Sequence, residues 1–415
     1  MTATGRAAYS ATPHCRICAS ADLETVLDLG EQNLTGIFPK NRTDEVTSGP
    51  LRLVRCVGKG GCGLVQLAHT YDLDEMYGEQ YGYRSGLNRS MVRHLGNKVE
   101  WLQKRRPLSE NELVLDIGSN DGTTLGFYPT HVDRLGIDPT TEKFRKFHPP
   151  GITAAAEFFS AESFARLVGD RKAAIVTSIS MFYDLPAPFD FVRDVASILA
   201  EDGVWHLEQS YLPLMLDTTS YDTACHEHLE YYGLTQLDWM FTRVGLRITQ
   251  VDFNDVNGGS FAVTVEKGVG HAPEVLALLE KERPLRDRET WIEFARAVEA
   301  HKRDLLALLH RLKGEGKRVF GLGASTKGNV LLQYCGIGPD LVEAIAEVNS
   351  DKFGSFTPGT LIPICSEEEA LARKPDVFLV LPWHFRRVLL EAHASFVAQG
   401  GKLLFPLPRI ELVGA

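Results

Sequence analysis

Short apolar runs that alternate with helical stretches are the feature that most constrains the fold of this chain. One series of such runs comprises residues 113–117, 134–137, 174–177, 204–207 and 261–265. A second series follows a long helical stretch at about 272–313 and comprises residues 318–322, 342–346, 360–363, 377–381 and 403–405. Strands that alternate with helices form mostly parallel, doubly wound sheets. The pattern therefore predicts an α/β protein with a central doubly wound unit and a smaller C-terminal Rossmann-like unit.

The chain has 415 residues, more than one hydrophobic core usually serves, so two or three packed units are expected. Residues 1–75 differ from the rest because their apolar stretches, 23–29 and 51–56, are separated by Gly, Pro and Asn with few helix signals. We therefore predict three parts, a small N-terminal domain at 1–75, a central domain at 76–270 and a C-terminal domain at 271–415.

Four of the seven cysteines lie within the first 62 residues, as the pairs Cys15/Cys18 and Cys56/Cys62. Two pairs of thiolates are the ligand set that tetrahedral zinc takes in closed structural sites, and a loop-rich segment needs such a staple. An odd number of cysteines in a cytosolic chain also favours metal ligation over disulfides. The alternative is four independent buried cysteines. We predict one structural zinc ion with no open position for catalysis.

Composition and charge narrow the class of partner. The formal net charge of -10 argues against a nucleic-acid-binding surface, because phosphate neutralisation requires a clustered basic excess. Apolar runs stay well short of the roughly 20 residues that a membrane-spanning helix needs, and residues 1–9 lack the apolar core of a signal peptide. The expected protein is soluble and cytoplasmic, binds small molecules rather than nucleic acid or membrane, and forms a monomer or a small homo-oligomer.

A glycine-containing turn follows the first apolar run. Residues 114–125 read Val-Leu-Asp-Ile-Gly-Ser-Asn-Asp-Gly-Thr-Thr-Leu, which predicts a strand, a turn and a helix. Gly118 and Gly122 allow a ligand to approach the backbone, and Asp116 can meet an ammonium group. The turn resembles motif I of class I methyltransferases, which holds the amino acid part of S-adenosylmethionine. A dinucleotide oxidoreductase would instead prefer Gly-x-Gly-x-x-Gly, and a generic structural turn is the remaining alternative.

Two further segments extend this predicted cofactor site. Asp138 ends the second strand about 20 residues after the glycine turn, where an acid commonly accepts hydrogen bonds from a ribose diol. Ser178 begins the segment after the 174–177 strand, which should supply a wall because ligands in open α/β sheets lie at the carboxyl ends of strands. The predicted cofactor residues are Asp116, Gly118, Asn120, Gly122, Asp138 and Ser178.

Residues 221–232, Tyr-Asp-Thr-Ala-Cys-His-Glu-His-Leu-Glu-Tyr-Tyr, are dense in groups that can move protons. His226 and His228 flank Glu227, but this spacing lacks the His-Glu-x-x-His geometry that puts two metal ligands one helical turn apart. A general base is therefore favoured over a second metal, with a chance surface cluster as the alternative. The turns Gln-Ser-Tyr-Leu-Pro and Asn-Gly-Gly-Ser, which begin at positions 209 and 257, are expected beside this segment.

With these motifs together, the chain resembles the S-adenosylmethionine-dependent sugar C-methyltransferase family of deoxysugar biosynthesis over essentially its whole length. The motifs that carry the resemblance are the four cysteines and residues 116–122, 210–213, 225–232 and 257–260. The resemblance implies an N-terminal zinc-binding domain, a central class I methyltransferase domain and a C-terminal α/β domain. It also implies that the methyl acceptor is a keto-sugar joined to a nucleoside diphosphate, often dTDP.

The resemblance further implies roles in the reaction centre. The family's catalytic Glu-His pair corresponds to Glu227 and His228, with His228 as the base and Glu227 orienting it or contacting the sugar. A carbon next to a ketone can be deprotonated by a positioned base, and the enolate can then attack the sulfonium methyl in line. Cys225 stands where characterised relatives can carry a tyrosine. The predicted catalytic residues are Tyr221, Cys225, His226, Glu227 and His228.

A second glycine loop, residues 320–329, joins a strand to a helix in the C-terminal unit. Free amides at a helix N-terminus can hold phosphate oxygens, although a purely structural turn is an equal alternative. The resemblance favours nucleotide-sugar binding here, and His384 is either a ligand to the same group or a structural histidine. The predicted substrate-binding residues are Tyr183, Asn257, Ser325, Lys327, Asn329 and Glu347.

Two competing functions stay open from the sequence. The first keeps the fold and cofactor but moves the methyl group to an oxygen or nitrogen of another small metabolite. The second is a nucleotide-sugar oxidoreductase or a non-catalytic binding protein, against which the missing Gly-x-Gly-x-x-Gly already counts.

Overall fold

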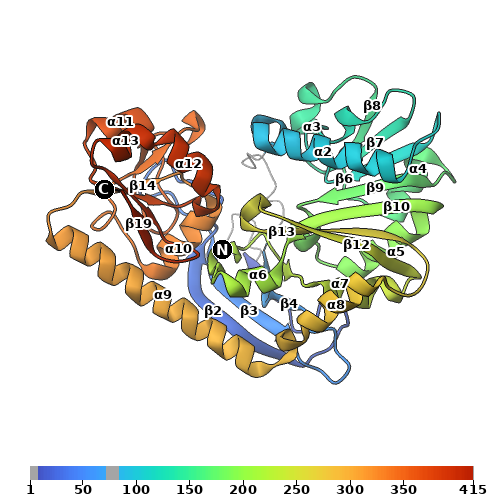
Figure 1. The fold of residues 1–415 in the computed structure, drawn as a ribbon, viewed down its shortest axis with the longest axis horizontal. Helices are drawn as coiled ribbons and strands as arrows, with labels where there is room; N and C mark the ends of the chain where they lie inside the picture. The colour runs from blue at the N-terminus through green and yellow to red at the C-terminus, as the bar shows by residue number, and fades with distance from the viewer. Residues whose placement is uncertain (1–7, 72–83, 415) are drawn as a thin grey trace.

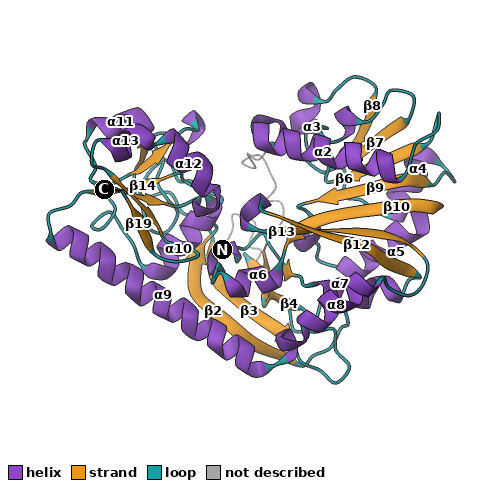
Figure 2. Cartoon of the chain, in the orientation of Figure 1, coloured by secondary structure: helices purple, strands orange, loops and turns teal. Residues whose placement is uncertain are grey.

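The structure is a computed structural model that describes residues 8–71 and 84–414. Its strands, within those residues, form sheets of two, four, six and seven strands. The six-stranded and seven-stranded sheets lie at opposite ends of the molecule, and the four-stranded sheet and the long helix α9 (Arg288–Gly314) span the region between them (Figure 1). Helices cover the two larger sheets on both faces (Figure 2). None of the described helices is long and apolar enough to cross a membrane.

The four-stranded sheet is antiparallel and has the order β11-β4-β3-β2. Its strands are β2 (Leu23–Asn33), β3 (Ser48–Cys56), β4 (Val65–Leu67) and β11 (Glu230–Tyr231). The two-stranded sheet pairs β1 (Tyr9–Ala11) with β5 (His69–Tyr71). Strand β11 comes from the centre of the chain, so the N-terminal sheet carries the end of the histidine-rich segment.

The seven-stranded sheet has the order β12-β13-β10-β9-β6-β7-β8. Its strands are β6 (Leu113–Ile117), β7 (Asp133–Ile137), β8 (Ile152–Ala155), β9 (Ala173–Ile179), β10 (Leu199–Ser210), β12 (Leu246–Asn254) and β13 (Ser260–Lys267). Neighbours from β10 to β8 are parallel, whereas β13 is antiparallel to both β10 and β12. The predicted mostly parallel, doubly wound sheet is confirmed.

Helices bury both faces of this sheet, which explains why its central strands are mostly apolar; His206 and Glu208 of β10 are buried polar exceptions. On one face, Val99 and Leu102 of α2 (Arg89–Arg105) pack with Val114, Ile175 and Val204. The opposite face packs against α4 (Ala161–Val168), α5 (Pro188–Ile198), α7 (Leu234–Thr242) and α8 (Pro273–Lys281). Short helical segments connect these elements: η1 (Ser85–Leu87), η2 (Leu125–Phe127), α3 (Thr141–Phe144), η3 (Arg145–Phe147), η4 (Phe182–Asp184), α6 (Leu212–Asp217), η5 (Tyr221–Thr223) and η6 (Val256–Gly258).

The six-stranded sheet has the order β16-β15-β14-β17-β18-β19, and only β18 and β19 are antiparallel. Its strands are β14 (Val319–Leu322), β15 (Ile345–Glu347), β16 (Ile364–Ser366), β17 (Val377–Val380), β18 (Lys402–Phe405) and β19 (Glu411–Val413). Its remaining helices are α10 (Thr326–Cys335), η8 (Ser350–Lys352), α11 (Glu367–Ala372), η9 (Trp383–Phe385), α12 (Arg386–Ala392) and α13 (Ala394–Ala398). A second, smaller α/β unit is therefore present.

The helical stretch predicted at about 272–313 is not continuous. Helix α8 ends at Lys281, the short η7 (Arg283–Arg286) follows, and α9 begins at Arg288. Pro284 lies at the break, and proline interrupts a helix because its nitrogen cannot donate and its ring clashes with the preceding turn. The prediction of a long helical stretch was therefore wrong between Lys281 and Arg288, where Pro284 interrupts it.

Candidate functional site

The four N-terminal cysteines converge on one point. Their Sγ atoms all lie within 4.8 Å of one another, with 3.4 Å between Cys15 and Cys62 and 3.5 Å between Cys18 and Cys56. A tetrahedral zinc ion with Zn–S bonds of about 2.3 Å requires sulfur separations of about 3.8 Å, so the cluster fits zinc. A Cβ on Gly61 would lie 2.8 Å from the Cys56 sulfur, which explains the glycine there. Four thiolates complete the coordination, so this is a closed structural site.

The glycine turn after β6 adopts the conformation that its residues predict. Gly118, Asn120 and Gly122 have φ values of +74°, +50° and +75°, which favour glycine and asparagine. The Asn120 amide donates to Asp138 Oδ2 at 2.8 Å, and Thr140 donates through its amide and hydroxyl to Asp138 Oδ1 at 2.6 and 2.5 Å. Asp138 therefore joins the turns that follow β6 and β7 at the carboxyl ends of these strands, and its contact with a cofactor stays a prediction.

Asp116 and Ser178, also predicted to contact the cofactor, lie inside the sheet. The Thr177 hydroxyl donates to Asp116 Oδ1 at 2.5 Å, and burial raises the pKa of this carboxyl to about 7. The Ser178 hydroxyl accepts the Trp205 indole N–H at 2.9 Å within the core. Neither placement supports direct contact with a ligand, because these polar atoms already serve contacts between strands.

The segment before α2 closes over the cofactor turn, a feature that nothing in the sequence indicated. The Ser85 amide donates to Asn120 Oδ1 at 3.0 Å, and the Gly86 amide donates to Asp121 Oδ2 at 2.9 Å. A Cβ on Gly86 would lie 2.6 Å from that carboxylate oxygen, so only glycine permits the approach. Segment η1 and the turn thus form one unit.

His228 has the geometry of a base. Its Nδ1 atom lies 3.1 Å from the Thr223 carbonyl oxygen, which can only accept, so Nδ1 carries the proton and Nε2 the lone pair. Burial lowers the pKa of His228 to about 4, which keeps the ring neutral near pH 7. The Tyr183 ring lies 4.3 Å from the His228 ring, centroid to centroid. Because Tyr183 follows β9, this contact places His228 near the carboxyl ends of the central strands, where the cofactor is predicted to bind.

The other predicted catalytic residues are placed differently. His226 is fully buried, its ring 4.5 Å from that of Tyr71. The Tyr221 hydroxyl lies 3.1 Å from His301 Nδ1 of α9, inside a hydrophobic core. These placements do not support contact of His226 or Tyr221 with a reacting group, because both rings are enclosed by protein.

Glu227 and Cys225 remain beside His228. Burial raises the pKa of the Cys225 thiol and of the Glu227 carboxyl. A Cβ on Gly36 would lie 3.0 Å from Glu227 Oε1, so Glu227 abuts the N-terminal unit. The Thr223 carbonyl, rather than Glu227, orients the His228 ring.

The C-terminal unit reaches the same region through α10 and η9. Lys327 Nζ donates to the Asn257 carbonyl at 2.5 Å, and the Asn257 side-chain amide lies 3.4 Å from the Ser180 hydroxyl. The Trp383 indole donates to Asp222 Oδ2 at 2.7 Å. Burial, reinforced by the charge of Lys327, lowers the pKa of His384 to about 3, so this ring is neutral. Two predicted substrate residues, Asn257 and Lys327, thus meet across the two units.

Three further predicted substrate residues instead hold the second glycine loop. Ser325 caps α10 by accepting the Gly328 amide at 3.0 Å. The Asn329 side chain donates to the Thr35 carbonyl at 2.8 Å, and Glu347 accepts the Ala324 amide at 2.8 Å. Glu347 also accepts the amides of its two following residues. These contacts shape the loop and leave direct contact of Ser325, Asn329 and Glu347 with a ligand as a prediction.

Comparison with known proteins matches this architecture part by part. Three family models match, described as a zinc binding domain at residues 15–77, a methyltransferase domain at 90–251 and a C-methyltransferase C-terminal domain at 255–408. The C-methyltransferase NovU of Streptomyces niveus is 30% identical over 418 residues, which cover 97% of each chain.

Solved structures match the central part with low sequence identity. YcgJ of Bacillus subtilis is 17% identical, with a TM-score of 0.34, over 43% of this chain and 100% of its own. The CcbJ methyltransferase of Streptomyces caelestis is 14% identical, with a TM-score of 0.33, over 42% of this chain and 90% of its own.

The family assignment rests on the relative that matches the full length and on the domain matches. A methyltransferase domain implies S-adenosylmethionine as the methyl donor, and the matched zinc binding domain contains the four converging cysteines. The predicted enzyme class and both predicted cofactors are thereby confirmed. The chain is an enzyme of the S-adenosylmethionine-dependent sugar C-methyltransferase family.

Proposed function

We propose that the chain transfers a methyl group from S-adenosylmethionine to the carbon next to the ketone of a keto-sugar linked to a nucleoside diphosphate. The observation that carries this proposal is the 3.1 Å contact between His228 Nδ1 and the Thr223 carbonyl oxygen, from which the tautomer of His228 follows. Its Nδ1–H donates to the Thr223 carbonyl, which leaves the Nε2 lone pair free to take a proton from carbon. An oxygen or nitrogen acceptor has a lone pair of its own, whereas a carbon acceptor must first lose a proton.

His228 Nε2 removes the α-proton, and the C–H electron pair becomes the enolate. The enolate carbon then attacks the sulfonium methyl, the S–CH3 bond breaks and its electrons stay on sulfur, giving S-adenosylhomocysteine. Tyr183, packed against His228, and Asn257 are the residues proposed to contact the sugar. The partly exposed Lys327, whose Nζ donates to the Asn257 carbonyl, is proposed to meet the diphosphate.

Deuterium exchange tests the carbon route directly. The enzyme is incubated in deuterated water with S-adenosylhomocysteine, which has no methyl group to transfer, and with dTDP-, GDP- or CDP-linked keto-sugars in turn. We expect one of these sugars to gain deuterium at its α-carbon with the native enzyme and none to do so with His228→Asn. In parallel, mass spectrometry and NMR of products made with S-adenosylmethionine locate the new methyl. Methyl transfer to oxygen or nitrogen, without deuterium uptake, would contradict the proposal.

A further inference from the structure

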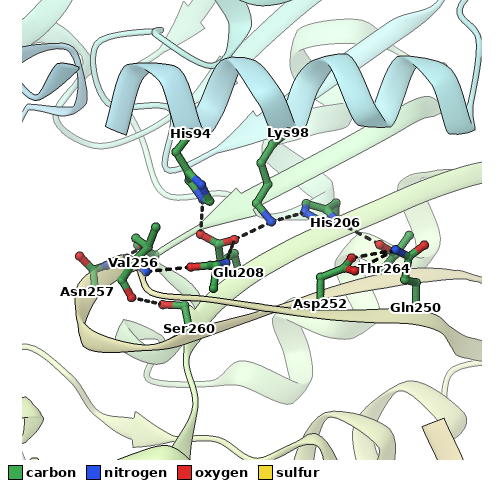
Figure 3. Close-up of polar contacts among 12 residues, drawn as sticks. His94, Lys98, His206, Glu208, Gln250, Asp252, Val256, Asn257, Ser260 and Thr264 are labelled. Carbon is green, nitrogen blue, oxygen red and sulfur yellow. Dashed lines mark hydrogen bonds and ion pairs between the residues drawn. The ribbon is translucent and has the colours of Figure 1, made fainter. Parts of the chain in front are cut away.

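A buried group of charged side chains lies between α2 and the central sheet, apart from the residues assigned above (Figure 3). Glu208 of β10 is fully buried. Its Oε1 atom accepts a hydrogen bond from His94 Nε2 at 2.6 Å, and its Oε2 atom lies 2.5 Å from Lys98 Nζ. His94 and Lys98 are four residues apart on α2, so they lie on the same face of the helix. Both oxygens of one carboxylate therefore bind α2.

The charges within this group are matched. Burial by itself raises the pKa of Glu208. The His94 hydrogen bond and the Lys98 charge outweigh this effect and lower the pKa to about 2, so the carboxylate is ionised. Lys98 Nζ also lies 3.2 Å from His206 Nε2. Burial and the Lys98 charge lower the pKa of His206 to about 3, so its neutral ring accepts at Nε2 and donates from Nδ1 to Thr264 Oγ1 at 3.0 Å. Removal of any one member leaves a buried partner unpaired.

These contacts hold α2 at His94 and Lys98, on either side of the buried Leu95 and close to its unburied first part. The buried apolar residues of α2 are Leu95, Val99 and Leu102, so no residue of its first turn and a half is buried. That first part follows η1, whose Ser85 and Gly86 amides bind the cofactor turn. The Glu208 pairs with His94 and Lys98 therefore attach the cofactor-closing segment to the sheet.

The same carboxylate also binds the opposite side of the site. The Asn254 side-chain amide donates to Glu208 Oε2 at 2.8 Å, and Asn254 Oδ1 accepts the Val256 amide at 2.9 Å. This pair of bonds shapes the turn at residues 254–259, which presents the Asn257 carbonyl to Lys327. Figure 3 shows Asn257 and Val256 on this turn beside Glu208.

We infer that Glu208 is a positioning residue for methyl transfer, which fixes the cofactor-closing segment through His94 and Lys98 and the acceptor-facing turn through Asn254. The part of the inference that concerns Asn254, the acceptor arm, rests on the function proposed above. The part that concerns His94 and Lys98, the cofactor arm, is independent of that function, because binding of S-adenosylmethionine can be measured without any acceptor.

The test replaces Glu208 by Gln in the full-length enzyme. One carboxylate oxygen becomes an NH2 group that faces other donors, so either His94 loses its acceptor at Oε1, or Lys98 and Asn254 together lose theirs at Oε2. We expect the dissociation constant of S-adenosylmethionine, measured by calorimetry, to rise about tenfold or more. Amide hydrogen exchange should become faster at residues 84–95 and 254–259 with little change elsewhere. At saturating S-adenosylmethionine, the KM for the acceptor should also rise.

Matched variants separate positioning from general destabilisation. Glu100→Gln makes the same chemical change on α2, in an exposed ion pair with Lys104, and should leave both affinities unchanged. Lys98→Met should repeat the loss of cofactor affinity, and Lys98→Arg should restore most of it by keeping the charge. These Lys98 variants also serve if Glu208→Gln does not fold.

Several results would overturn the inference. Cofactor affinity within twofold of the native value in folded Glu208→Gln or Lys98→Met protein would exclude the cofactor arm, as would an equal loss in Glu100→Gln. Reduced cofactor affinity with an unchanged acceptor KM would exclude the acceptor arm alone. A wrong acceptor would leave the calorimetric result untouched, so failure of the proposed function stays distinguishable.

Discussion

Replacing His228 by Asn is the sharpest perturbation that the structure offers. The side-chain amide of asparagine occupies the position of a histidine Nδ1, so it can still donate to the Thr223 carbonyl that lies 3.1 Å from Nδ1 in the native enzyme. It has no group at the position of Nε2. The substitution therefore keeps the orienting hydrogen bond and removes only the proton acceptor.

The expected loss follows from this geometry. A positioned general base contributes about 10²- to 10⁴-fold to rate, so kcat should fall by that factor, which corresponds to about 2.7 to 5.4 kcal/mol in the activation barrier. Affinity for S-adenosylmethionine should stay nearly native, because His228 contacts Tyr183 and Thr223 rather than the glycine turn. The assay combines single-turnover methyl transfer with calorimetry. His226→Asn is the control, since that ring is enclosed against Tyr71.

The pH profile gives a second measure of the same group. Burial lowers the pKa of His228 to about 4, so the ring is a free base at neutral pH and becomes protonated only under acid conditions. Native kcat/KM should therefore fall with decreasing pH as the enzyme passes through this pKa, and this limb should vanish in His228→Asn. Equal, small losses in His226→Asn and His228→Asn, or an unchanged rate of α-proton exchange in His228→Asn, would refute the assignment.

Four further predictions concern the metal, the cofactor, the thiol and stability. Cys15→Ser should remove the single zinc ion found by metal analysis and unfold at least the N-terminal sheet, because structural zinc supplies folding free energy; full retention of zinc would contradict this. Asp138→Ala should weaken S-adenosylmethionine binding by about 1 to 3 kcal/mol in calorimetry, since its carboxylate organises the turn and can still accept from a ribose; native affinity would exclude it. Cys225→Ser should keep most of the activity in a methyl-transfer assay if the thiol only fills space beside Glu227, and a large loss would make it a participant. Unfolding temperature should decrease as pH falls from about 6.5 to about 4, because His206 and His226 have folded pKa values lowered by burial to about 3 and about 4, and the unfolded chain therefore binds more protons; a flat profile would contradict the buried neutral rings.

Local pattern predicted most strands of the two larger sheets and the zinc cluster. The strand predicted at 360–363 was wrong, because β16 begins only at Ile364. A strand buried on both faces reads as a continuous apolar run, which is why 113–117 was found within the correct bounds. Strands at the sheet edges were missed. Strand β12 is partly exposed, and β8 has only four residues, so neither presents a clear apolar signal. The convergence of the paired cysteines could be predicted from the sequence, because tetrahedral zinc needs four ligands at one point.

The roles of single polar residues were harder to predict, because burial and hydrogen bonding depend on residues distant in sequence. Asp116 and Ser178 stand in the predicted cofactor segments, yet their partners are Thr177 and Trp205 inside the sheet. Glu208 belongs to no sequence motif. Its contacts with α2 form only when that helix, more than one hundred residues earlier in the chain, packs onto β10. A motif fixes the chemistry that is available, whereas the fold decides which atoms are free to use it.

Strand β11 links the zinc cluster to the histidine-rich segment. Glu230 follows His228 by two residues and pairs with Gln66 of β4, which itself lies four residues beyond the zinc ligand Cys62. Arg16 lies in the sequence between the zinc ligands Cys15 and Cys18, and its Nε atom is 3.5 Å from the buried Glu230 carboxylate. The cysteine cluster therefore fixes the strand on which the histidine-rich segment ends, although it contacts no reacting atom. With His228 as the proposed base, the closed metal site would support catalysis through the backbone that it holds in place.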